Sequence, residues 1–160
     1  MMRKGLVPEF QKAGLDPSKI VVNGGAGMNF GGAAKIGNMS LGLVPAVHST
    51  LAGFPPASFI LDIGGSRVYI SGDTDLFGDM KLIGERFKPD LLLVPVGGHF
   101  VMNPTEAAYA TKELVKPKMA WPIHFGSNPM LKGTPAEFKA ALGNGGIQVV
   151  DMNPGDKKQF

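Results

Sequence analysis

Cysteine is absent from the 160-residue sequence. Its absence excludes disulfide bonds and thiolate metal sites, so a bound metal ion would have to use histidine, aspartate or glutamate. The sequence also lacks an apolar run long enough to cross a bilayer, and it does not open with a secretory leader. We therefore expect a cytoplasmic protein that does not enter the membrane.

A concentrated basic surface is also missing. The net charge is +3, from 16 lysines and arginines against 13 acidic residues. Because the basic residues are dispersed and few aromatic residues lie among them, the sequence argues against a nucleic-acid surface. The dispersed lysines are Lys81, Lys88, Lys112, Lys116, Lys118, Lys132 and Lys139.

Glycine and proline, in contrast, are plentiful. The 23 glycines and 13 prolines lie between apolar runs rather than in one tract, which favours short elements joined by tight turns. Hydrophobic residues make up 44% of the chain, enough for a sizeable core. No linker or repeat divides the sequence, so we expect a single domain over residues 1–160.

The first third of the chain predicts short elements around a glycine-rich loop. Arg3–Ala13 is typical of the end of a helix, and Lys19–Val22 of a short strand. The glycine-rich segment 23–32 resembles a phosphate-binding loop, but such a loop needs a helix directly after its glycines. Ala33–Val47 alternates in polarity and predicts a strand instead, so segment 23–32 is interpreted as turns between strands.

The middle of the chain predicts a hairpin, a helix and a buried strand. Ser58–Ile63 and Arg67–Ser71 form two strands separated by two glycines, which tolerate the positive φ of a hairpin turn. Asp79 is expected to cap a helix that runs to about Phe87. Leu91–Val96 is a continuous apolar run typical of a strand buried on both faces.

The last third predicts alternating helices and strands. Two segments, Asn103–Glu106 and Thr134–Glu137, each place a cap residue, a proline and a glutamate at capping-box spacing. The first helix should run to about Val115. Met119–Ile123 and Gln148–Asp151 predict strands. The order of elements therefore indicates an α/β fold, with mixed strands followed by β-α-β-α-β.

Ligand-type side chains follow the predicted strands. The three histidines of the chain, His48, His99 and His124, each come directly after an apolar strand, and Asp73 does the same. Ligands of α/β sheets bind beyond the carboxyl ends of the strands, so these four side chains could converge on one site. Imidazole and carboxylate ligands suit zinc, manganese or iron, and such an ion lowers the pKa of a bound water.

Each of these residues also has a purely structural interpretation. A single histidine is more often a surface or hydrogen-bonded core residue than a ligand, so the joint pattern carries the hypothesis. Asp73, in Gly-Asp-Thr, could equally be a turn residue that accepts backbone hydrogen bonds. Glu106 and Glu137 belong to capping boxes, and we assign them no catalytic role.

The segments around these residues resemble the metallo-β-lactamase superfamily, especially its branch of small bacterial metal-dependent hydrolases that includes ascorbate-phosphate lactonase-like proteins. The resemblance runs from about Ile20 to about Phe138. It implies the C-terminal half of an αββα sandwich, a mixed sheet with helices on one face. The matching segments are Val44–Thr50, Val68–Thr74, Asp79–Glu85, Leu93–Phe100 and Trp121–Gly126.

The resemblance also implies roles for single residues. His48 matches a histidine on the first metal, Asp73 a carboxylate that bridges two metals, and His124 a histidine on the second metal. His99 matches a histidine at the rim of the site that contacts the substrate or supports a ligand. The family's His-x-His-x-Asp-His motif does not occur in this sequence. We therefore expect an incomplete site that binds zinc or manganese weakly, or not at all, in the isolated chain.

Three functions follow as hypotheses. The first is a hydrolase that uses metal-activated water on a small-molecule lactone, ester, amide or phosphoester. The second is a non-catalytic scaffold or subunit, and the third, disfavoured by the dispersed lysines, is a nucleic-acid-binding module. If the first half of the fold is missing, apolar residues such as Leu91, Leu93 and Met119 lie on an open sheet face. A second copy of the chain, or a missing N-terminal half, would then cover it.

Overall fold

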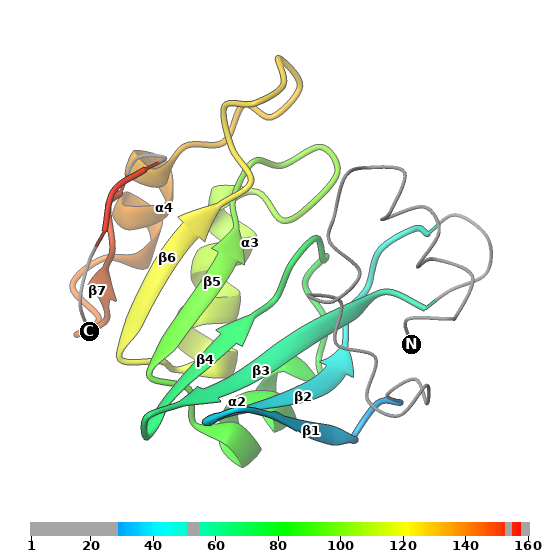
Figure 1. Cartoon of the computed structure of the whole chain (residues 1–160). Helices are drawn as coiled ribbons and strands as arrows, with labels where there is room; N and C mark the ends of the chain where they lie inside the picture. Colours follow the sequence, from blue (N-terminus) through cyan, green and yellow to red (C-terminus); the bar gives the residue numbers. More distant parts are fainter. Residues whose placement is uncertain (1–28, 51–54, 153–154, 158–160) are drawn as a thin grey trace.

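The computed structural model describes residues 29–50, 55–152 and 155–157. The predicted helix over Arg3–Ala13, the predicted strand Lys19–Val22 and most of the glycine-rich segment lie outside these residues. Seven strands form one sheet in the order β1-β2-β3-β4-β5-β6-β7, so every strand pairs with its neighbour in the sequence (Figure 1).

The first four strands pair antiparallel. They are β1 (Ala33–Ile36), β2 (Met39–Pro45), β3 (Ala57–Ile63) and β4 (Ser66–Ile70). The prediction of one continuous strand over Ala33–Val47 was wrong, because the chain reverses between β1 and β2. Gly37 adopts a φ of 61° there, a conformation that suits a tight turn.

The predicted hairpin is confirmed in β3 and β4. Phe59 lies opposite Ile70 and Ile63 lies opposite Ser66. The two connecting residues, Gly64 and Gly65, have φ angles of 58° and 88°. A two-residue turn with positive φ at both positions matches the right-handed twist of the flanking strands, which explains the pair of glycines.

The remaining strands run parallel to β4. They are β5 (Leu91–Pro95), β6 (Met119–Ile123) and β7 (Gln148–Val149). All three were predicted, although β7 is shorter than the expected strand over Gln148–Asp151. The mixed α/β sheet expected from the order of elements is therefore confirmed.

All helices of the described residues lie behind the sheet in the view of Figure 1. Both predicted capping boxes are present: Asn103 with Glu106, and Thr134 with Glu137. Asp79 precedes its helix as expected, but its side chain makes no capping hydrogen bond. The helices are α2 (Met80–Phe87), α3 (Pro104–Tyr109), the π-helical η5 (Ala110–Val115) and α4 (Pro135–Leu142).

The helix after Asn103 ends near Val115 as predicted, but its second half is a π-helix rather than an α-helix. This stretch lies against α2 at Gly84, where an added Cβ would come within 2.6 Å of the Val115 carbonyl oxygen. Glycine is therefore required for the close approach of the two helices.

The main core lies between the sheet and the helices. Ile60, Tyr69 and Leu92 point from the strands toward Met80 and Phe138 on the helices, and all are at most 4% exposed. Burial raises the pKa of the Tyr69 hydroxyl to about 12, so this residue stays neutral within the core.

The opposite face of the sheet is also apolar. Residues paired across the strands share a face, and the pairs Phe59 with Ile70 and Leu61 with Val68 alternate with the core-facing residues. Phe59 is 39% exposed. No helix of the described residues covers this face in Figure 1. The described helices also include none with the length and apolar character needed to span a membrane.

Candidate active site

The chain segments that leave the strands are joined by backbone hydrogen bonds. After β2, Val47 accepts a hydrogen bond from the Asp75 amide at 2.8 Å, so the end of β2 lies beside the loop that follows β4. That loop also contacts the segment after β5, because the Met102 amide donates to the Thr74 carbonyl at 3.3 Å. Loops from different strands therefore form one edge of the molecule.

Two of the four predicted site residues face each other at this edge. His124 directly follows β6, and Asp73 lies in the loop after β4. The His124 Nε2 atom is 3.5 Å from the Asp73 Oδ1 atom. The Asp73 side chain is 52% exposed and the His124 side chain 27% exposed, so the pair is open to solvent on the aspartate side.

His124 is held in an uncommon backbone conformation, with a φ of 57°. A bulky residue adopts positive φ rarely, and such residues cluster at functional sites. Its Nδ1 atom is buried and has no hydrogen-bond partner among the described residues. Buried polar atoms are normally hydrogen-bonded, so an imidazole nitrogen without a partner sets His124 apart from an ordinary core histidine.

The donor atoms of Asp73 and His124 fit a divalent metal ion. Carboxylate oxygen and imidazole nitrogen are ligands that zinc and manganese accept. Two ligands at about 2.0–2.2 Å from a tetrahedral ion lie about 3.4 Å apart, and the observed separation is 3.5 Å. This separation is long for a hydrogen bond between the same atoms. The two residues would therefore hold the ion together.

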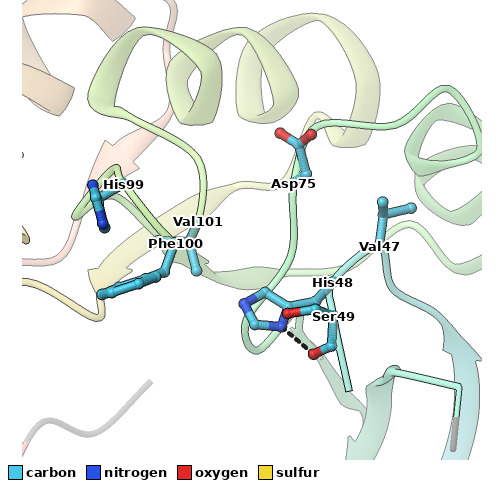
Figure 2. A pocket seen from close by; sticks show the side chains of 7 residues that line it. All are labelled: Val47, His48, Ser49, Asp75, His99, Phe100 and Val101. Carbon is cyan, nitrogen blue, oxygen red and sulfur yellow. Dashed lines mark hydrogen bonds between the residues drawn. The ribbon is translucent and has the colours of Figure 1, made fainter. Parts of the chain in front are cut away.

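His48 and His99 line a neighbouring cavity of about 500 Å³. Figure 2 shows the segment of His48 on one side of this cavity and the segment of His99 on the other. The His48 Nδ1 atom lies 2.7 Å from the Ser49 carbonyl oxygen, which leaves Nε2 for a ligand. His99 contacts the Phe100 ring edge-on, with ring centroids 4.4 Å apart.

In the part of the chain that the structure describes, no group of three or more histidine, aspartate or glutamate side chains is placed to hold one metal ion. The structure thus brings Asp73 and His124 together but does not add His48 to the pair. Catalytic zinc sites ordinarily have three protein ligands. The metal-ligand roles of His48, Asp73 and His124, and the substrate-contacting or supporting role of His99, stay predictions.

Thr74 is a further residue of the site that the sequence reasoning missed. Its side chain is fully buried. The Thr74 hydroxyl accepts a hydrogen bond from the Val47 amide at 3.0 Å and donates one to the Asp75 carbonyl at 2.9 Å. It therefore positions the residue before His48 against the loop that holds Asp73. A threonine directly after Asp73 was the only available signal.

The relatives found by comparison with known proteins share one description, metal-dependent hydrolase. A metal-dependent hydrolase of Polaromonas sp. is 50% identical over 109 residues, which cover 68% of this chain and 40% of the relative. A metal-dependent hydrolase of Archaeoglobus fulgidus is 40% identical over 145 residues, which cover 84% of this chain and 62% of the relative. The chain thus spans two fifths of the length of the first relative and about three fifths of the second.

Solved structures agree with this comparison. The structure of a metallo hydrolase from the archaeon Ignicoccus hospitalis superimposes with a TM-score of 0.78 at 32% identity, covering 96% of this chain and 65% of that one. The family described as "Beta-lactamase superfamily domain" matches residues 9–125, which include His48, Asp73, His99 and His124. The chain therefore belongs to the β-lactamase superfamily, in which it shares the metallo-β-lactamase fold.

Proposed function

We propose that the chain acts in metal-dependent hydrolysis of a small-molecule lactone, ester, amide or phosphoester. The observation that carries this proposal is the convergence of Asp73 Oδ1 and His124 Nε2, 3.5 Å apart, beyond the ends of parallel strands. Ligands of α/β sheets bind at this edge. The names of the relatives, metal-dependent hydrolases, support the same class of reaction.

Asp73 and His124 would hold a zinc or manganese ion, and His48, from the adjoining cavity, would be a ligand of a second ion nearby. When bound, such an ion polarises the scissile group and makes water a better nucleophile near neutral pH. The protein residues do the positioning: Thr74 fixes the approach of the His48 segment to the Asp73 loop. His99, on the far side of the cavity, would contact the substrate or support a ligand.

We propose further that the site formed by the described residues is incomplete. Asp73 and His124 supply two donors, one fewer than the usual three of a catalytic zinc site. The expected consequence is weak metal affinity and slow turnover by the isolated 160-residue chain. Tight binding of two metal ions per chain, with rapid ester or lactone hydrolysis, would contradict this part of the proposal.

The test combines metal and activity measurements on the purified chain. Hydrolysis of p-nitrophenyl butyrate and of a γ-lactone would be followed after treatment with a chelator and after addition of zinc or manganese. We expect slow hydrolysis that the chelator abolishes, that metal restores, and that Asp73→Asn removes. Hydrolysis that is unaffected by both the chelator and Asp73→Asn would refute the proposal, as would complete absence of metal binding and hydrolysis.

A second candidate function is a scaffold or subunit, favoured by the apolar face of the sheet. Phe59 and Ile63 on this face are 39% and 38% exposed. Exposed apolar surfaces of this kind commonly mark sites of association. We propose a second copy of the chain, or another polypeptide that supplies the first half of the fold, as the occupant. Light scattering over a dilution series should then show self-association of the purified chain, and a persistent monomer would oppose a second copy.

A further inference from the structure

A second cavity, of about 520 Å³, adjoins the one in Figure 2 and shares His99 with it. The loops that follow β5 and β6 form its walls. Its lining consists of glycines, prolines, one methionine and a few polar side chains: Gly97, Gly98, His99, Asn103, Pro104, Pro129, Met130, Lys132 and Gly133.

The floor of this cavity is tightly joined to the backbone of His124. The Gly133 amide donates to the Gly97 carbonyl at 3.1 Å, which ties the loop after β6 to the end of β5. A Cβ atom on Gly97 would lie 2.2 Å from the His124 carbonyl oxygen, and one on Gly133 would lie 2.0 Å from the Val96 carbonyl oxygen. Only glycine permits these approaches, so the cavity keeps a defined position beside the backbone of His124.

Lys132 is the free charged group of the cavity. Its side chain is exposed and has no ion-pair partner among the residues that the structure describes. The Asn103 side-chain oxygen already accepts hydrogen bonds from the Thr105 and Glu106 amides, and the Glu106 carboxylate accepts one from the Asn103 amide. The backbone amides of Asn103, Thr105 and Glu106 are therefore hydrogen-bonded within the protein. Lys132 is the charged group of the cavity that remains to bind an anion.

The other lining residues indicate the chemical character of the part of the ligand that does not contact Lys132. Pro104, Pro129 and Met130 present apolar surface. His99 lies between this surface and the cavity of His48, because it lines both. A ligand that fills the second cavity would thus have a short apolar body with an anionic group at one end.

We propose that this cavity binds the non-reacting part of the substrate, an organic acid whose carboxylate or phosphate group pairs with Lys132. The inference rests on the proposed hydrolase function. The apolar body would lie against Pro129 and Met130, and the scissile group would extend past His99 toward Asp73 and His124. Lys132 would thereby determine specificity for anionic over neutral substrates, without touching the reacting atoms.

The binding test uses glutarate, inorganic phosphate and the neutral dimethyl glutarate as probes. Amide signals of Gly97, Gly98 and Gly133 in a proton–nitrogen NMR spectrum would be followed in titrations of the full chain. We expect an anion to shift these signals and dimethyl glutarate to leave them in place. Lys132→Met should weaken anion binding about tenfold, Lys132→Arg should retain it, and Lys139→Met, on α4, should have no effect.

The two anions distinguish the source of the negative charge. Tighter binding of glutarate would assign the site to a carboxylate, and tighter binding of phosphate to a phosphoryl group. Absence of any shift at millimolar anion, or shifts that survive unchanged in Lys132→Met, would overturn the proposal.

The hydrolysis test separates this inference from the proposed function. Mono-p-nitrophenyl glutarate and p-nitrophenyl butyrate carry the same leaving group and differ in the distal carboxylate. Lys132→Met should raise KM for the anionic ester about tenfold, leave its kcat unchanged, and leave the neutral ester unaffected. Metal-dependent hydrolysis of both esters with an unchanged preference in Lys132→Met would refute the subsite alone. Lys132-dependent glutarate binding without any hydrolysis would refute the hydrolase function alone.

Discussion

The two ends of the parallel strands differ in whether their charged side chains have partners. At the amino end, Asp90 accepts a hydrogen bond from the Arg67 amide at 2.8 Å and pairs with Lys118 at 2.7 Å. The Arg67 guanidinium donates to Asp62 and to the Phe87 carbonyl oxygen, both at 2.6 Å. Every one of these groups has a partner, which is typical of charges that stabilise a fold.

At the carboxyl end, the ligand-type side chains are left available. The Asp73 Oδ1 atom lies 3.5 Å from His124 Nε2, a distance too long for a good hydrogen bond. No shorter hydrogen bond to Asp73 is found among the described residues. Lys132 has no ion-pair partner among those residues. The paired charges at the amino end stabilise the sheet, and the available donors at the carboxyl end support the proposed ligand site there. Variants at the two ends should therefore separate stability from binding.

The largest effect is expected from removal of a metal ligand. Asp73→Asn should lower zinc or manganese affinity by about 100-fold or more, because a neutral amide oxygen replaces a carboxylate, and loss of merely supporting residues already costs about 10–100-fold. The free energy of unfolding should change by less than about 0.5 kcal/mol, since Asp73 is exposed. Isothermal titration calorimetry measures the first quantity and urea denaturation the second.

Asp75→Asn is the matched control for this variant. Asp75 is also an exposed carboxylate of the same loop, and it accepts a hydrogen bond from the Leu76 amide that asparagine can accept too. Metal affinity should be unchanged in Asp75→Asn. Equal losses in both variants would mean that the general negative charge of the loop, rather than Asp73, attracts the ion.

Arg67→Met should produce the opposite result at the amino end. It removes the guanidinium contacts to Asp62 and Phe87 and leaves both acceptors without this donor. We expect a loss of about 2 kcal/mol in the free energy of unfolding and no change in metal affinity. Arg86→Met is the control. Arg86 lies over the Phe87 ring, and loss of this contact should lower the free energy of unfolding by only about 0.5–1 kcal/mol. Reduced metal affinity in Arg67→Met would break the separation between the two ends.

Thr74→Val tests a residue that contributes both to stability and to the position of the site segments. Valine has the same shape but cannot hydrogen-bond the Val47 amide, so we expect a loss of about 1–2 kcal/mol in stability. NMR signals of the His48 ring should also shift, because the segment before His48 loses its anchor. Thr74→Ser keeps the hydroxyl and should restore the ring signals. Unchanged His48 signals in Thr74→Val would show that Thr74 does not position this segment.

The smallest effect concerns acid stability. The hydrogen bond with Lys118, together with that from the Arg67 amide, holds the pKa of Asp90 below its ordinary value of 3.8. A carboxyl group with a lowered pKa in the folded state stabilises the fold above its unfolded pKa, and this contribution is lost as the pH falls. The free energy of unfolding of the wild-type chain should exceed that of Asp90→Asn by about 1 kcal/mol near pH 7. This difference should shrink below about pH 4. Urea denaturation across this pH range measures it, and a constant difference would contradict the assignment.

The elements with strong local signals were predictable from the sequence. The two capping boxes, the Gly64-Gly65 hairpin and the apolar run of β5 combine local propensity with hydrophobic pattern, so they were placed within a residue or two. The turn at Gly37 was missed although the sequence carries a signal for it: Gly37-Asn38 is a two-residue hairpin loop between the paired residues Ile36 and Met39. The π-helical geometry of η5 was not predictable, because apolar residues spaced three to four apart indicate a helix but do not distinguish a π-helix from an α-helix.

The proximity of Asp73 and His124 was predictable from the sequence, but the geometry of their contact was not. Their placement after strands predicted that the two side chains lie at one edge of the sheet, where they are 3.5 Å apart. Which side chains meet depends on loop conformation, such as the positive φ of His99 and His124, and on buried contacts such as those of Thr74. Neither feature follows from residue spacing, because each is imposed by packing between segments distant in the sequence.

The most direct test of the central claim is a crystal structure of the chain soaked with zinc, with anomalous data collected at the zinc edge. We predict an anomalous peak about 2.0–2.2 Å from both Asp73 Oδ1 and His124 Nε2. A peak that avoids both atoms, or no peak at millimolar zinc with Asp73 and His124 joined by a direct hydrogen bond, would contradict the account.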